Sequence, residues 1–347
     1  MFMLSFILLF NAWIIFAQKF PEAKAFLAQN ELLEIRPATG QAGGEFERKV
    51  YEKISWREVL EKEKRIPIFI NLLGVTAVFV FSLGLFLDIR ILMVRVKKRE
   101  IFKNVGRHLR VKWEIWDIFK LAIIFVFLGY IIHMLEAALF SPSAEKDALT
   151  LTPLLNTGIM DLALLAFIIY FVKVKFRQNL SAIGLKIKGA AKNITLAILG
   201  YIAFLPVLTF LLLLLILLAA LLNYQPPQQA IFKLFLQEKR FWFLVYSTAM
   251  VVILGPFVEE AFFRGFAYNA IKKRWGARTS ALLTAVVFAG LHGTLFGFLP
   301  IMALGLLLAY MYEKTGSLFP SITIHMLHNS IMLGFLFLAR YFMRFAQ

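Results

Sequence analysis

Long apolar segments separated by basic loops constrain the fold of this chain more than any other feature. Several windows exceed about 18 apolar residues, which is long enough to cross the hydrocarbon core of a bilayer. Hydrophobic residues make up 60% of the 347-residue chain, whereas a soluble domain has roughly half. The sequence therefore predicts an all-α fold, a polytopic transmembrane helical bundle of about 8–9 membrane helices.

The positive charge follows the loops. The net charge is +17, which in a soluble protein would indicate nucleic acid as a partner. Here the basic residues cluster near 90–115, 173–192 and 272–278, between apolar segments, as cytoplasmic loops do. We therefore expect the lipid bilayer as a partner and no nucleic acid. The protein should be integral to the plasma (inner) membrane and multi-pass, with its N-terminus cytoplasmic, or lie in an endomembrane if the chain is eukaryotic.

Composition divides the chain near residue 190. Residues 1–190 are predicted to form an accessory membrane region, with a retained first helix at 1–17 and an outer segment at 18–66. Residues 193–347 carry the unusual polar residues. Further membrane segments are expected at about 67–89, 117–140, 151–172, 193–222, 240–270, 279–293, 296–313 and 318–343. The absence of cysteine excludes disulfides, thiolate catalysis and Cys-ligated metal sites.

The stretch LGPFVEEAFFRGF, residues 254–266, places three charges in one apolar segment. A charged side chain at mid-bilayer costs roughly 2.5–3.5 kcal/mol on insertion scales, so such residues face a bundle interior or a wet cavity. Glu260 and Arg264 are four residues apart and can pair on one helix face, which leaves Glu259 free on another side. We interpret Glu259 as the reactive carboxylate, a general base, and Gly255 and Pro256 as a predicted kink before it.

Two later apolar helices carry histidines. In the first, Phe288 and His292 are four residues apart, and in the second, His325 and Asn329 are. Three of the five histidines thus follow the glutamate pair on successive helices. Glutamate, histidine and asparagine are the residue types that activate water and stabilise an oxyanion. His328 lies outside this spacing and is expected to be a bystander or a group that contacts the site residues from behind.

The ordered motifs E-E-x-x-x-R (Glu259, Glu260, Arg264), F-x-x-x-H (Phe288, His292) and H-x-x-x-N (His325, Asn329) give the chain a family resemblance. Over roughly residues 193–347 it resembles the CAAX protease and bacteriocin-processing (CPBP) family of intramembrane endopeptidases, which includes type II CAAX prenyl endopeptidases. The resemblance implies a protease core that hydrolyses a peptide bond of a membrane-tethered or membrane-proximal protein.

The resemblance also implies a role for each residue. Glu259, with His292, activates a water, and His325 and Asn329 stabilise the tetrahedral oxyanion. Glu260, Arg264 and Phe288 occupy supporting positions.

Three alternatives stay open at this point. In a zinc-dependent protease, Glu259, His292 and His325 would hold Zn²⁺; we favour a mechanism without a cofactor, because Asn329 is a poor zinc ligand and a good oxyanion donor. Intramembrane charge also occurs in transporters, and a non-catalytic scaffold is the third alternative. A second polar set, His133 and Glu136 with Asn156 and Asp161, is interpreted as pairs between neighbouring helices.

Overall fold

The structure is a computed structural model that describes residues 65–96, 111–139, 148–224, 234–236 and 238–345. Side chains are described throughout these ranges except at 65–70, 95–96, 133, 136–139, 148–153 and 342–345. The segments predicted at 1–17 and 18–66 lie outside the described residues. The chain forms two compact units, Met1–Leu83 with Phe337–Gln347, and Gly84–Leu336, and every candidate site residue lies in the second.

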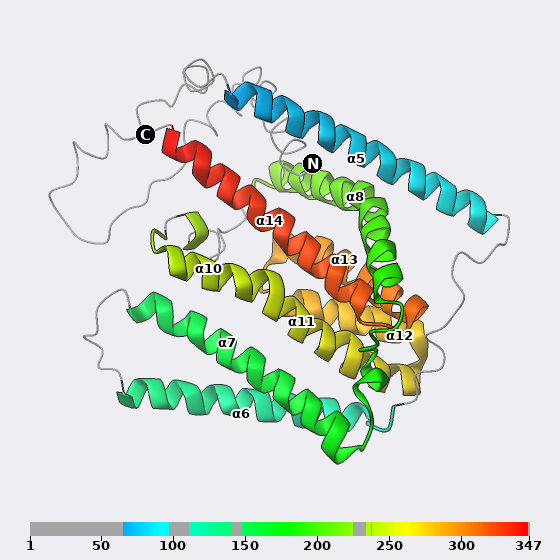
Figure 1. Ribbon diagram of the computed structural model, residues 1–347, viewed down its shortest axis with the longest axis vertical. Coiled ribbons are helices and arrows are strands. Elements are labelled where there is room, and N and C mark those ends of the chain that lie inside the picture. Colours follow the sequence, from blue (N-terminus) through cyan, green and yellow to red (C-terminus); the bar gives the residue numbers. More distant parts are fainter. Residues whose placement is uncertain (1–64, 97–110, 140–147, 225–233, 237, 346–347) are drawn as a thin grey trace. The chain divides into compact units, whose positions relative to one another are not determined.

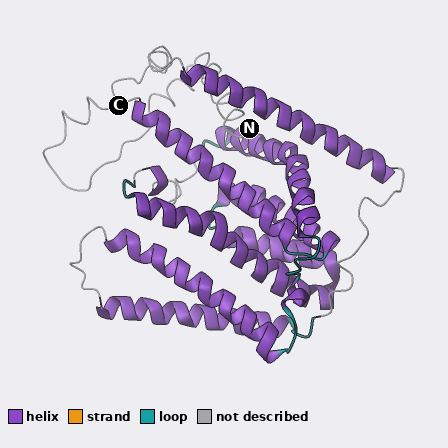
Figure 2. Ribbon diagram, viewed as in Figure 1, coloured by secondary structure: helices purple, strands orange, loops and turns teal. Residues whose placement is uncertain are grey.

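Every regular element in the described residues is a helix (Figure 2). The elements are α5 (Arg65–Val96), α6 (Ile115–Leu139), α7 (Ala148–Ile169), η2 (Tyr170–Lys175), η3 (Leu180–Ile183), α8 (Ala190–Leu221), α10 (Phe241–Ala249), η4 (Met250–Leu254), α11 (Gly255–Glu260), η5 (Ala261–Ala267), α12 (Tyr268–Leu291), α13 (Leu295–Thr315) and α14 (Phe319–Phe345). Within the described residues, seven helices are long and apolar enough to cross a membrane, one of them the continuous run Phe241–Leu291. The predicted polytopic helical bundle is confirmed. The division into an accessory region and a protease core stays a prediction.

The run from α10 to α12 contains turns that are not α-helical. The π-helical segments η4 and η5 stand directly before and after α11, which holds both glutamates. A π turn inserts a residue into an α-helix and is frequent at functional sites. The deformation predicted from Gly255 and Pro256 therefore takes the form of π turns on either side of the glutamates.

The expected separate segment at 279–293 is part of α12. The helix breaks at Gly276, whose φ of 80° and ψ of 172° suit a residue without a Cβ. The arm from Ala277 to Leu291 is about 22 Å long at 1.5 Å per residue, shorter than the roughly 30 Å hydrocarbon core. This arm packs closely against α13, and the turn between the two helices begins at His292.

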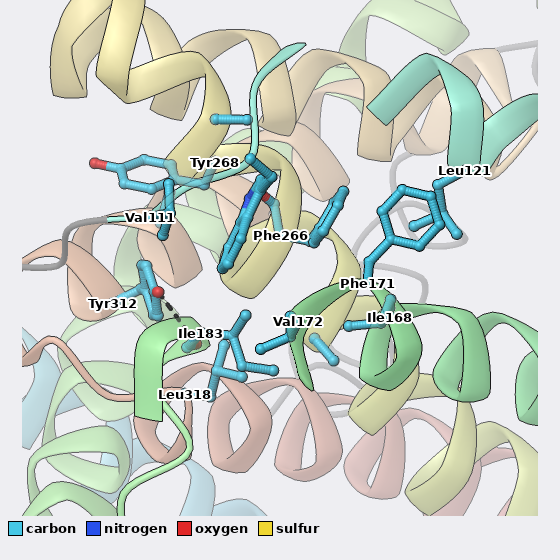
Figure 3. Close-up of a cluster of buried hydrophobic side chains, with 14 of the residues drawn as sticks. Val111, Leu121, Ile168, Phe171, Val172, Ile183, Phe266, Tyr268, Tyr312 and Leu318 are labelled. Carbon is cyan, nitrogen blue, oxygen red and sulfur yellow. Dashed lines mark hydrogen bonds between the residues drawn. The ribbon is translucent and has the colours of Figure 1, made fainter. Parts of the chain in front are cut away.

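Figure 1 shows α6, α7 and the α10–α11 run side by side, and residue contacts join α6 to α7 and α7 to α11. At the end of η5, a buried aromatic cluster holds the motif segment in place (Figure 3). Trp113 stacks on Phe266 with ring centroids 5.0 Å apart, and its Nε1 donates to the Phe266 carbonyl at 2.9 Å. The Tyr312 hydroxyl donates to the Ile183 carbonyl at 3.1 Å (Figure 3). These contacts fix η5 against its neighbours and so fix the direction in which α11 presents its glutamates.

Candidate active site

Glu260 and Arg264 form the ion pair that their spacing predicts. Arg264 Nη1 lies 2.7 Å from Glu260 Oε1, and both side chains are completely buried. Arg264 Nη2 also donates to the Gly305 carbonyl on α13 at 3.1 Å, and its guanidinium lies 4.7 Å from the centre of the Phe288 ring. The arginine therefore joins η5 to α12 and α13 as well as neutralising Glu260.

Glu260 has a second partner that the sequence did not reveal. His325 Nδ1 lies 3.0 Å from Glu260 Oε1, and the histidine is 3% exposed. An ionised carboxylate only accepts hydrogen bonds, so Nδ1 of His325 carries the proton. The other ring nitrogen, Nε2, is turned toward Glu259 Oε2 at 3.8 Å. Glu260 thus orients His325 in the way that a buried carboxylate orients a catalytic imidazole.

Glu259 keeps unused hydrogen-bonding capacity. Its side chain is 36% exposed, and its buried Oε2 has no hydrogen-bond partner among the described residues. Buried polar atoms without partners are uncommon in proteins and call for a functional or structural reason. A half-accessible carboxylate with a free oxygen can take a proton from a small molecule bound next to it.

Phe288 lies between the two motif histidines. Its ring centroid is 4.7 Å from that of His292 and 5.5 Å from that of His325. His292 caps the C-terminus of α12, and its Nδ1 lies 2.7 Å from the Phe288 carbonyl. A carbonyl only accepts, so Nδ1 donates, and Nε2 of the neutral ring is left as an exposed acceptor. Among the described residues His292 makes no hydrogen bond or ion pair with Glu259.

Asn329 connects the last helix to the first π turn. Its Nδ2 donates to the Val251 carbonyl in η4 at 2.8 Å. One further N–H of the amide and its oxygen are left for other partners. Asn329 and His325 are four residues apart on α14, so they share a face that is turned toward η4 and α11.

The structure also places Asp161 near the site, which sequence reasoning missed. This residue of α7 is close enough to Glu259 and to Tyr246 for their charges to interact. The side chains of His133 and Glu136, its predicted partners, lie outside the described ones. An acid in an apolar segment is a functional candidate by default, and that signal was present in the sequence.

Zinc was an alternative for Glu259, His292 and His325. Within the part of the chain that the structure describes, no group of three or more His, Asp or Glu side chains is arranged to hold a metal ion. Only Glu259 and His325 approach each other, at 3.8 Å. We therefore derive no step through a metal, and metal dependence is left to the chelation experiment below.

Comparisons with known proteins support the resemblance over part of the chain. Residues 241–331 match the family model described as "Type II CAAX prenyl endopeptidase Rce1-like". The protein "Putative membrane peptidase YdiL" of Bacillus subtilis (strain 168) is 28% identical over 80 residues. That alignment covers 23% of this chain and 33% of the relative, so the chain spans about a third of its length. No solved structure matches. The matched segment contains all seven motif residues, and over it this chain is related to the CAAX protease and bacteriocin-processing family.

Proposed function

We propose that this protein is an intramembrane endopeptidase that hydrolyses a peptide bond through a glutamate-activated water. The observation that carries the proposal is the unequal use of the two glutamates. Oε2 of each glutamate has no hydrogen-bond partner among the described residues. Glu260 is completely buried, however, with its Oε1 bonded to both Arg264 and His325, whereas Glu259 is 36% exposed and its Oε2 lies 3.8 Å from His325 Nε2. One carboxylate supports the site and the other is free to act as a base.

In the proposed reaction, Glu259 takes a proton from water as the water oxygen attacks the peptide carbonyl carbon. His292 assists through its exposed Nε2, which is an acceptor because Nδ1 donates to the Phe288 carbonyl. The tetrahedral oxyanion accepts hydrogen bonds from Asn329 and from His325. Glu259 then returns the proton to the leaving amine as the C–N bond breaks.

His325 needs a proton on both ring nitrogens to donate through Nε2. Its Nδ1 lies 3.0 Å from Glu260 Oε1, so a carboxylate is in place to compensate the charge of the imidazolium in the proposed transition state. Arg264 pairs with Glu260 at 2.7 Å in a place where a lone carboxylate would be costly. The three buried side chains of Glu260, Arg264 and His325 thus act as one unit.

The substrate is proposed to be a membrane-tethered or membrane-proximal protein or peptide. A lipidated C-terminus, a leader peptide and a C-terminal sorting segment all have this character. The match to the type II CAAX prenyl endopeptidase family favours a prenylated C-terminus as the first probe to use.

Glu259→Ala and His292→Ala test the proposal. The purified full chain, reconstituted in lipid vesicles, is given a fluorogenic farnesylated peptide that ends in a CAAX sequence, and the same peptide without the lipid. Each variant should lose about 10²-fold or more of the cleavage rate, as expected when an acid–base group is removed. Asp88→Ala, on α5, is the matched control, because it removes a carboxylate from a helix that carries no site residue.

A second readout does not depend on the probe. The N- and C-termini of membrane proteins are compared by mass spectrometry between cells that carry the wild-type chain and cells that carry Glu259→Ala. Processed termini should disappear in the variant. Unchanged termini together with unchanged cleavage in both variants would rule out a protease.

Zinc is the competing mechanism, and exhaustive chelation separates the two. Purified enzyme should keep its activity after chelation if Glu259 acts without a metal. Loss of activity that added Zn²⁺ restores would establish the zinc version instead.

A further inference from the structure

We propose that His328 is a further hydrogen-bond donor in the site, which Tyr201 of α8 holds with its proton on Nε2 for the substrate's peptide carbonyl. This inference rests on the proposed protease function and adds a residue to it. Neither side chain belongs to the three motifs, and Tyr201 lies outside the segment that matches the family model.

The pair is defined by a direct contact. The Tyr201 hydroxyl lies 3.0 Å from His328 Nδ1, and the two rings meet edge to face with centroids 6.0 Å apart. Tyr201 is 2% exposed. Gly200 beside it lies against α13, where a Cβ would meet the Met311 side chain at 3.4 Å. The hydroxyl is therefore held in a fixed place by the packing of α8.

Burial decides which atom donates. His328 is the only partner of the Tyr201 hydroxyl among the described residues. If Nδ1 donated to the tyrosine oxygen, the phenol hydrogen would be buried with no acceptor, which costs about 1–3 kcal/mol. The hydroxyl therefore donates to Nδ1, and the neutral ring carries its hydrogen on Nε2.

His328 lies on the face of α14 that holds the other candidate groups. At about 100° per residue, His328 lies 60° to one side of His325 and Asn329 lies 40° to the other side, so the three cover about 100° of the helix. His328 is half-buried, and Nε2 has no partner in the described part of the chain. The N–H therefore has no partner within the described part of the chain and is left for a substrate group.

A neutral N–H donor has a defined use there. The carbonyl oxygen of a peptide bond gains negative charge as water attacks, and each positioned donor stabilises that charge. Losing one such donor typically lowers kcat by about 10²–10³-fold. A neutral ring can serve as this donor. Because the Tyr201 hydroxyl donates to Nδ1, His328 keeps its hydrogen on Nε2 and does not need to become a second imidazolium beside His325.

The proton position can be measured without any substrate. The full chain in lipid vesicles is labelled with ¹⁵N-histidine, and the five histidines are assigned by single substitutions, His328→Gln among them. In the wild type, Nδ1 of His328 should be unprotonated and Nε2 protonated. In Tyr201→Phe this preference should be lost. A protonated Nδ1 in the wild type, or a spectrum that Tyr201→Phe leaves unchanged, would overturn the inference.

Kinetics test the role in catalysis, with the farnesylated CAAX peptide as probe. His328→Leu should lower kcat by about 10²-fold while KM changes less than about twofold, and His328→Gln, whose amide nitrogen can replace Nε2, should recover much of the loss. Tyr201→Phe should fall between them. Tyr130→Phe on α6 is the control, because it removes a tyrosine hydroxyl from an exposed position on a helix that carries no motif residue, and its kcat should not change.

The outcomes separate this inference from the proposed function. If His328→Leu keeps the wild-type kcat while Glu259→Ala abolishes cleavage, the protease stands and the role of His328 falls. If the wild type processes no protein, the protease falls. In that case the wild-type chain is mixed with the farnesylated peptide, and an unchanged Nε2 signal of His328 rejects the donor role as well.

Discussion

Glu259 and Glu260 are adjacent, but their surroundings differ in a way that stability measurements can detect. Glu260 is completely buried between Arg264 and His325, whereas the Glu259 side chain is 36% exposed. Removing one partner of a buried ion pair leaves an uncompensated charge, at a cost of about 3–5 kcal/mol. We therefore expect Glu260→Gln to lower the free energy of unfolding by about that amount, and Glu259→Gln to change it by less than about 1 kcal/mol.

Thermal unfolding of the two variants in the same detergent checks this expectation. Asp88→Gln provides a third variant that loses a carboxylate far from the motif along the chain. Equal stability of Glu259→Gln and Glu260→Gln would contradict the division of roles between the two glutamates.

Arg264 makes three different contacts, and lysine cannot reproduce them. The guanidinium donates to Glu260 and to the Gly305 carbonyl and lies 4.7 Å from the centre of the Phe288 ring. Lysine has no planar fork, so Arg264→Lys should lose the Gly305 bond and the stacking. We expect a loss of roughly 1–3 kcal/mol in stability, with lower activity because Glu260 and His325 lose their fixed positions.

Arg278→Lys on the exposed part of α12 is the matched control and should unfold like the wild type. Wild-type activity and stability in Arg264→Lys would show that charge alone is needed at position 264.

At the scale of the helices, the hairpin of α12 and α13 depends on a small residue. A Cβ on Gly305 would lie 3.1 Å from Ala285 and 3.4 Å from Arg264 Nη2. Gly305→Val should push α13 from α12 and displace the arginine, at a cost of about 1–3 kcal/mol for overpacking and with loss of activity. Gly334→Ala on α14 meets open space within 4 Å and should be neutral or slightly stabilising.

Thermal unfolding and peptide cleavage are compared for both glycine variants. If Gly305→Val unfolds and cleaves like the wild type, close packing of α12 and α13 is not what positions Arg264.

Sequence periodicity predicted the local part of the site and missed the long-range part. The pairing of Glu260 with Arg264 follows from four-residue spacing, and the structure confirms it. The contact of His325 with Glu260 joins residues 65 apart in the chain, and helical spacing carries no information about which helices meet. The π turns η4 and η5 depend on the packing around them for the same reason.

Residues beyond the motifs show the same limit. Asp161 was assigned to a polar set on neighbouring helices. Its nearness to Glu259 could not be predicted, because it arises only when α7 packs against α11. For His328 the spacing left open a bystander or a supporting group, and it could not predict the contact with Tyr201, which joins residues 127 apart in the chain. The separate segment expected at 279–293 became one arm of α12, since the basic cluster before Gly276 does not reveal where a helix breaks.

At the scale of the molecule, the loop charges make a prediction about topology. Lys186 and Arg274 lie in basic loops that should face the cytoplasm, and Lys239 precedes α10 at the opposite end of a membrane segment. The chain contains no cysteine, so a single introduced cysteine reports its own position without background. Lys239 and Arg274 are exposed, so the change to cysteine is mild there, and Lys186 is half-buried.

In intact cells, a membrane-impermeant maleimide should label Lys239→Cys but not Lys186→Cys or Arg274→Cys. In inverted vesicles the pattern should reverse. Permeabilised cells, in which all three cysteines should react, control for local accessibility. Labelling of positions 239 and 274 from the same side would show that the run from α10 to the break at Gly276 does not cross the membrane. The arm that leads to His292 would then start from a different membrane face than the basic loops predict.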